Sequence, residues 1–142
     1  YAQRIAHSIT QVFKRGGSVD TTRQLAALVE QSLSFLPGAE RKEAVKKSCQ
    51  RTFQALRIDV NSEFEALYAF LEKLPTVLKS GGRAAVLTFH SGEDRLVKKA
   101  FQQYHRQGVY REISEEVIRP SAQECFQNPR ARSTKLRWAV RA

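Results

Sequence analysis

The apolar segment from Arg83 to Phe89 is the feature that most constrains the fold of this chain. It follows the turn Ser80-Gly81-Gly82 and leads directly into a polar stretch. The segment lacks the apolar-polar alternation of a strand with one exposed face, so we expect a strand that is buried on both faces in a parallel sheet. Such a strand needs neighbours on both sides. Because the sequence before it predicts only helices, we expect half of an α/β sheet to come from elsewhere, either from a longer protein or from another chain.

Apolar residues at spacings of three and four predict helices through most of the first 75 residues. Thr21 and Gln24 form a capping box at the start of the second helix. A polar, lysine-rich stretch over residues 40–48 predicts a short exposed helix. The apolar stripe over residues 53–74 predicts one long amphipathic helix, or two joined with a slight bend, and we expect the pattern to end at Pro75.

Beyond the central strand, the sequence predicts a helix and then two further strands. Ser91 is the expected N-cap of that helix, with Asp94 three residues later. Residues 109–113 predict one strand, and residues 135–141 predict a final strand in which apolar and basic residues alternate. We expect these two strands to form the closing antiparallel edge of the sheet.

The chain is strongly basic, with 24 Lys and Arg against 14 Asp and Glu and a net charge of +10. The first 71 residues carry a net charge of +3 and the remaining 71 carry +7. A charge of this size favours a polyanionic partner, although excess charge can also serve only to keep a protein in solution. From Asn128 to the end there is no acidic residue, and the cations are Arg130, Arg132, Lys135, Arg137 and Arg141.

Cysteine and metal-ligand patterns carry little signal. Cys49 and Cys125 lack the paired spacing of a zinc or redox motif, so we expect reduced thiols and no metal site. No apolar run approaches the roughly 20 residues needed to cross a bilayer, and no signal peptide opens the chain. We therefore expect a cytoplasmic protein, or an organellar one in a eukaryotic source. The absence of Met leads us to expect a piece of something longer.

His90 and Ser91 follow the central strand and are the first candidates for a functional site. Ligands of open α/β sheets bind beyond the carboxyl ends of the strands, and a helix start offers free N–H groups to an anion. The alternatives are a plain N-cap for Ser91 and a loop hydrogen bond for His90. Arg95 can pair locally or contact RNA. Arg130 and Arg132 flank Ala131 and present two guanidinium groups that suit phosphate.

Three blocks of this sequence, taken together, resemble the MraW/RsmH family. The first runs from Arg51 to Ile58 with Val60-Asn61, the second from Gly81 to Ser91 with Glu93-Asp94-Arg95, and the third from Asn128 to Arg137. Family members use S-adenosylmethionine to methylate N4 of a cytidine in the decoding region of small-subunit (16S) rRNA. One departure is Gly92, which stands where the family usually has Leu.

The resemblance implies an α/β fold, namely part of a class I (Rossmann-like) methyltransferase sheet with an all-α inserted domain. Residues 1–50 would belong to the inserted substrate-recognition domain, and residues 51–142 to the C-terminal half of the methyltransferase domain. The S-adenosylmethionine site is expected upstream of this chain. His90 and Ser91 would border the target-base pocket, and the expected RNA contacts are Arg95, Arg130, Arg132, Lys135 and Arg137.

Two alternatives remain open beside the enzyme. In the first, the chain is a catalytically silent module that binds RNA or the assembling small ribosomal subunit. In the second, the chain restores its incomplete sheet by self-association, for example as a homodimer.

Overall fold

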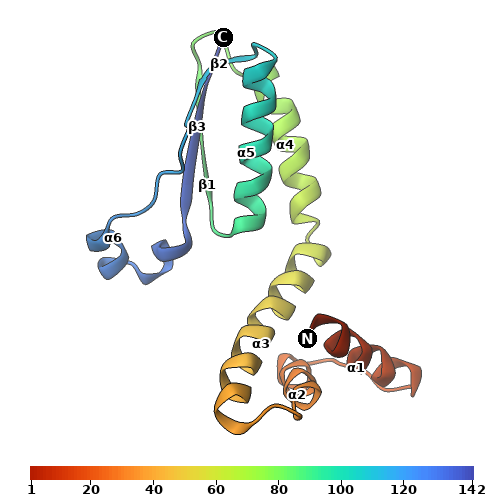
Figure 1. Cartoon of the computed structure of the whole chain (residues 1–142). Helices are drawn as coiled ribbons and strands as arrows, with labels where there is room; N and C mark the ends of the chain where they lie inside the picture. The colour runs from red at the N-terminus through yellow and green to blue at the C-terminus, as the bar shows by residue number, and fades with distance from the viewer. The chain divides into compact units, whose positions relative to one another are not determined.

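The computed structural model describes all 142 residues and divides into two compact units, Tyr1–Asn61 and Ser62–Ala142 (Figure 1). The elements in chain order are α1 (Ala2–Lys14), α2 (Thr22–Ser32), α3 (Gly38–Val60), α4 (Glu63–Val77), β1 (Arg83–Thr88), α5 (Ser91–Arg106), β2 (Tyr110–Ile113), α6 (Ala122–Gln127), the 3-10 helix η1 (Pro129–Ser133) and β3 (Lys135–Arg141). No helix combines the length and the apolar character that crossing a membrane requires.

The first unit is built from helices alone. Its core consists of Ile5 from α1 with Val29 and Leu33 from α2 and its C-cap, and apolar residues at the start of α3 pack against it. The predicted capping box is confirmed, because the Thr21 side chain accepts the N–H of Gln24 and the Gln24 side chain accepts the N–H of Thr21.

The helix boundaries after residue 38 differ from those expected. The stretch over residues 40–48 is not a separate helix but the first part of α3, which runs on to Val60. The apolar stripe is then broken at Ser62, whose φ of 47° and ψ of 43° are left-handed, and α4 begins at Glu63. Of the two alternatives, two helices rather than one is confirmed. The stripe could not reveal the break, because the spacing of apolar residues is maintained across it.

The expected helix end at Pro75 and the expected domain boundary near residue 50 can be compared with the observed helices. Pro75 does not end the pattern at once but lies inside α4, which ends soon after it, at Val77. The expected domain boundary near residue 50 falls within the uninterrupted α3, and compactness divides the chain at Asn61 instead. The assignment of residues 1–50 to an inserted domain stays a prediction.

The second unit contains a three-stranded sheet in the order β1-β3-β2. Both pairs are antiparallel, so the predicted closing pair of strands is confirmed. The expectation that Arg83–Phe89 is buried on both faces of a parallel sheet is wrong for this chain. β1 is an edge strand, and the Leu87 side chain is 52% exposed. Burial alternates along β1, because Ala84 and Val86 pack against the core under the helices while Leu87 points to the opposite face, which no helix of this chain covers.

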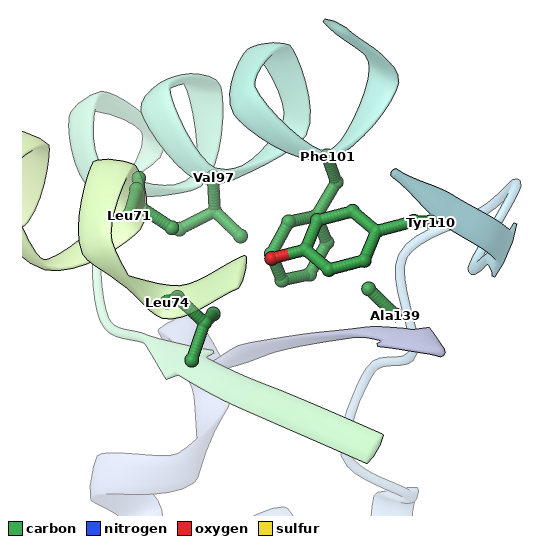
Figure 2. Close-up of a cluster of buried hydrophobic side chains, with 6 residues drawn as sticks. All are labelled: Leu71, Leu74, Val97, Phe101, Tyr110 and Ala139. Carbon is green, nitrogen blue, oxygen red and sulfur yellow. The ribbon is translucent and has the colours of Figure 1, made fainter. Parts of the chain in front are cut away.

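Helices α4 and α5 pack against each other, and α5 also packs against all three strands (Figure 1). Phe101 of α5 and Tyr110 of β2 meet edge to face with ring centroids 5.6 Å apart. Burial, together with the charge of Tyr104, raises the pKa of Tyr110 to about 12 against the opposing effect of Arg141, so its hydroxyl stays neutral. The buried cluster consists of Leu71, Leu74, Val97, Phe101, Tyr110 and Ala139 (Figure 2).

The basic residues of β3 face this helical layer rather than solvent. Arg137 is 7% exposed and is bonded to Asp94 of α5. Arg141 donates from Nε to the Pro75 carbonyl oxygen at 3.2 Å and from a terminal nitrogen to the Val109 carbonyl oxygen at 2.7 Å. The alternation predicted for the final strand is therefore confirmed, while its basic face is the one that the helices cover.

Candidate functional site

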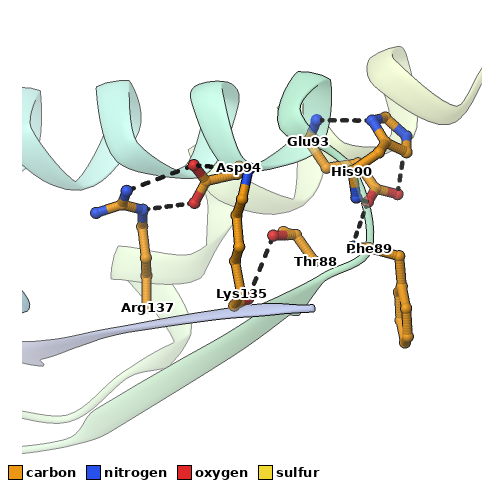
Figure 3. A network of polar contacts seen from close by, with 7 residues as sticks. All are labelled: Thr88, Phe89, His90, Glu93, Asp94, Lys135 and Arg137. Carbon is orange, nitrogen blue, oxygen red and sulfur yellow. Dashed lines mark hydrogen bonds and ion pairs between the residues drawn. The ribbon is translucent and has the colours of Figure 1, made fainter. Parts of the chain in front are cut away.

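The pairing of β1 with β3 brings two polar segments, residues 88–95 and residues 128–137, to the same end of the sheet. Thr88, at the end of β1, pairs with Lys135, at the start of β3. The Thr88 hydroxyl also donates to the Lys135 carbonyl oxygen at 3.2 Å (Figure 3). Because the strands are antiparallel, the start of α5 and the end of η1 meet at this end of the sheet. We call this end, with residues 88–95 and 128–137, the rim.

His90 rather than Ser91 is the N-cap of α5. Its Nδ1 accepts the backbone N–H of Glu93 at 3.3 Å, and Glu93 Oε2 accepts the N–H groups of Phe89 and His90 at 2.9 and 3.3 Å (Figure 3). This is a reciprocal capping box in which an imidazole replaces the usual hydroxyl. Ser91 is the first residue of the helix and is exposed. The expectation that Ser91 caps the helix was therefore wrong by one position.

The capping geometry fixes the tautomer of His90. Because Nδ1 accepts a hydrogen bond, the ring proton is on Nε2. Nε2 lies 3.5 Å from Glu93 Oε1, and it forms a cluster with the carboxylates of Glu63 and Glu93 in which the ligand atoms lie within 4.8 Å of one another. A metal ion would need the lone pair at the nitrogen that holds the proton. We therefore interpret the cluster as part of the helix cap.

Gly92 allows His90 to pack closely against Phe64 of α4. The two rings meet edge to face with centroids 6.0 Å apart. A Cβ atom at position 92 would lie 2.9 Å from Phe64 Cζ and 3.0 Å from His90 Nδ1, closer than side chains tolerate. Gly92 therefore leaves the room in which the capping histidine packs against Phe64.

Asp94 joins α5 to β3 through two cations. Arg137 Nε donates to Asp94 Oδ1 at 2.7 Å and its Nη2 donates to Oδ2 at 3.4 Å, while Lys135 Nζ lies 3.8 Å from Oδ2 (Figure 3). Burial acts to raise the pKa of Asp94, but the hydrogen bond from Arg137 and the charges of Arg137, Lys135 and Lys98 outweigh it. The pKa of this carboxyl therefore lies below its ordinary value.

The five expected RNA contacts fall into two groups. Arg95, Arg130 and Arg132 are exposed at the rim. Lys135 and Arg137 have side chains only 14% and 8% exposed, and both are engaged with Asp94. The structure thus leaves three guanidinium groups open to a ligand and uses two cations inside the fold.

The 3-10 helix η1 holds Arg130 and Arg132 in a defined turn. Asn128 Oδ1 accepts the N–H of Arg130 at 3.2 Å, and the Asn128 carbonyl oxygen accepts the N–H of Ala131 at 2.9 Å. Ala131 is buried, so the turn is anchored between its two exposed arginines.

The sequence reasoning missed both short helices of the segment between β2 and β3. A signal was present for each of them. Ser121 and Glu124 have the spacing of a capping box, and the Ser121 hydroxyl accepts the N–H of Glu124 at 3.1 Å. Asn128-Pro129 places a capping residue before a proline, which is typical of a helix start.

Comparison with known proteins gives one consistent result. The MraW methylase family matches the chain over residues 1–142. A protein of Lachnoclostridium phytofermentans named ribosomal RNA small subunit methyltransferase H 1 is 61% identical over 142 residues, which are 100% of this chain and 39% of that protein. The protein of the same name from Agathobacter rectalis is 61% identical over 100% of this chain and 41% of its own length. Ribosomal RNA small subunit methyltransferase H 2 of Alkaliphilus metalliredigens is 59% identical over 138 residues, 97% of this chain and 40% of its own length. The chain therefore spans about two fifths of the length of these relatives.

Proposed function

This chain belongs to the MraW methylase family, and from that premise we propose that it is the RNA-facing portion of a methyltransferase. The reaction is the S-adenosylmethionine-dependent methylation of N4 of a cytidine in the decoding region of small-subunit rRNA. In this proposal Arg95, Arg130 and Arg132 bind rRNA phosphates, and His90 and Ser91 border the pocket for the target base.

The observation that carries the proposal is the pairing of Thr88 with Lys135. It sets a polar strand end beside a basic turn, which is the arrangement needed to hold a polyanion next to a reacting base. Guanidinium groups bind phosphate through two donors at once, so the exposed pair in η1 suits this role better than lysines would.

The rim by itself does not provide the groups that would hold S-adenosylmethionine. Its two carboxylates are already used, since Glu93 caps α5 and Asp94 is bonded to Arg137. Both carboxylates are therefore committed to contacts that hold the fold together. We assign no step of the reaction to the cofactor within this chain, and we propose that its binding residues belong to other parts of the enzyme.

The role that we propose for this chain is to bind the RNA and to orient its target cytosine. Placing the cytosine amine in line with the methyl group converts an encounter between two molecules into a step within one complex. A rim fixed by the capping box and by the Asp94–Arg137 pair is suited to this task, because it gives the RNA a rigid surface.

The assigned phosphate contacts can be tested with a synthetic RNA hairpin of the decoding region and the 142-residue chain. Replacing Arg130 and Arg132 together by Gln should weaken binding several-fold and lower the slope of log K against log salt by about 1–2. The matched control replaces Arg106 and Arg111, two exposed arginines at the opposite end of the sheet from the rim, by Gln. Equal slopes for the two double variants would contradict the phosphate assignment.

The alternative of a catalytically silent RNA-binding module is favoured by the use of both rim carboxylates in contacts within the fold, beside arginines that stay exposed. A calorimetric titration of S-adenosylmethionine into the folded chain separates the two readings for this polypeptide. Saturable binding, followed by transfer of a labelled methyl group to the hairpin, would rule out the silent module. A flat titration with intact RNA binding would mean that this portion acts on RNA only within a longer enzyme.

A further inference from the structure

The side chain of Phe126 is 86% exposed, more than any other large apolar side chain of the chain. It lies on α6, in the segment that joins β2 to β3. The other residues of this helix are mostly small or polar, namely Ala122, Gln123, Glu124, Cys125 and Gln127. A protein partner generally needs a broad apolar patch, whereas here a single ring stands on a polar helix.

Exposed arginines lie on both sides of Phe126 in the sequence, and two of them belong to η1, which packs against α6. Arg119, Arg130 and Arg132 are exposed in the segment between β2 and β3, and so are Glu115, Glu116 and Glu124. The three glutamates all precede Phe126, whereas the two arginines of η1 follow it without an acidic residue between them. A flat apolar surface beside guanidinium groups is the combination that binds single-stranded nucleic acid, with bases on the ring and phosphates on the cations.

The backbone holds Phe126 and Arg130 in a fixed relation. The N–H of Asn128 donates to the Glu124 carbonyl oxygen at 2.7 Å, which closes α6, and the Asn128 side chain accepts the N–H of Arg130, which opens η1. The two short helices pack against each other. One asparagine thus links the aromatic ring to the two arginines of the rim.

The segment lies at the end of the sheet where β3 begins. Figure 1 shows α6 projecting beyond the strands and away from the layer formed by α4 and α5. This is the same end at which β1 delivers His90 and Ser91. The start of α5 and the segment that carries Phe126 therefore belong to the same end of the sheet.

We propose that Phe126 is a stacking platform for an unpaired RNA base that flanks the methylation target, with Arg130 and Arg132 binding the adjoining phosphates. This inference rests on the proposed function, since it assumes that RNA contacts the rim. It adds the prediction that part of the affinity comes from a base rather than from phosphate.

The test compares two single-stranded oligonucleotides of equal length, one of uridines and one of abasic residues, which carry the same phosphates. Binding of each to the 142-residue chain is measured by fluorescence anisotropy. Phe126→Leu should weaken binding of the uridine oligonucleotide roughly tenfold and leave binding of the abasic one unchanged. Phe126→Trp should restore uridine binding, because the indole ring also stacks. The matched control is Tyr68→Leu, which removes an exposed aromatic ring from α4.

The outcomes separate this inference from the function on which it rests. If Phe126→Leu weakens neither oligonucleotide while the double Arg130 and Arg132 variant weakens both, the stacking role is overturned and the phosphate contacts stand. If the wild-type chain binds neither oligonucleotide nor the hairpin, both proposals fail. If Phe126→Leu weakens both oligonucleotides equally, or lowers the melting temperature by more than the control does, the ring has a structural role and the stacking role is overturned.

Discussion

Asp94 at the start of α5 and Arg137 in β3 form a two-point ion pair, with 2.7 Å between Oδ1 and Nε. The residues are 43 positions apart in sequence, and both side chains are at least 86% buried. The pair therefore fixes the helix that carries His90 to the strand that follows the basic turn. It is the polar link that makes the rim a single rigid structure.

Breaking this pair should destabilise the second unit. Arg137→Met keeps the aliphatic bulk but removes both hydrogen bonds from the partly buried Asp94 and leaves it only the more distant charges of Lys135 and Lys98, so we expect a loss of about 2–3 kcal/mol in the free energy of unfolding. Urea denaturation followed by circular dichroism measures it. The control Arg95→Met removes an exposed arginine one residue from Asp94 and should change stability by less than about 0.5 kcal/mol. Equal losses in the two variants would contradict the role of the pair.

The same pair predicts how stability depends on pH. The folded pKa of Asp94 lies below its ordinary value of 3.8, so its contribution is fully present above about pH 4 and is lost as the pH falls through the lower folded value. Asp94→Asn lacks this titration. From pH 5 to pH 3 we expect the variant to lose less unfolding free energy than the wild type does. Parallel losses would show that Asp94 titrates alike in both states.

The capping role of His90 predicts a specific order of stabilities. His90→Ala removes the acceptor for the N–H of Glu93 and the ring contact with Phe64, and should cost about 1–2 kcal/mol. His90→Asn keeps an acceptor at the N-cap and should recover most of the helix-capping contribution. Ser91→Ala should be nearly neutral. The melting temperatures of the three variants test this order. A larger drop in melting temperature for Ser91→Ala than for His90→Ala would identify Ser91 as the cap.

Gly92 should resist substitution because of its neighbours rather than its backbone. Gly92→Ala places a methyl group against Phe64 and His90, and we expect a loss of about 1 kcal/mol despite the better helix propensity of alanine. In a Phe64→Leu background the same change should cost less, because the contact with the Phe64 ring is removed while the one with His90 stays. The free energies of unfolding of the four proteins form a double-mutant cycle. An unchanged cost of Gly92→Ala in the second background would mean that Phe64 is not the obstacle.

The free edge of β1 predicts self-association of the isolated chain. An unpaired edge with an exposed Leu87 offers backbone groups and apolar surface to a second copy. We expect sedimentation velocity to show a species that grows with concentration, and Leu87→Lys to reduce it. A strictly monomeric chain at all concentrations would leave the edge to a different partner.

Much of the local structure was readable from the residues in order. Helical spacing, the Thr21 capping box and the strands at both ends of α5 all depend on neighbours within a few positions. The sequence left open whether the helix breaks near Ser62, because the apolar spacing continues across that residue and the break depends on one left-handed backbone conformation. The cap at His90 was missed because an imidazole is an unusual capping group, and the neighbouring serine is the more typical one.

The sequence by itself determined the alternation of β3, the basic character of the chain and the family blocks, because these depend only on the identity and spacing of residues. The tertiary structure decided which face of β3 the helices cover, and so divided its basic residues into those that hold the fold and those that face a ligand. Arg137 and Arg132 are chemically equal in the sequence. The pairing of β1 with β3 sets Arg137 beside Asp94, a carboxylate 43 residues away, while the turn of η1 directs Arg132 to solvent.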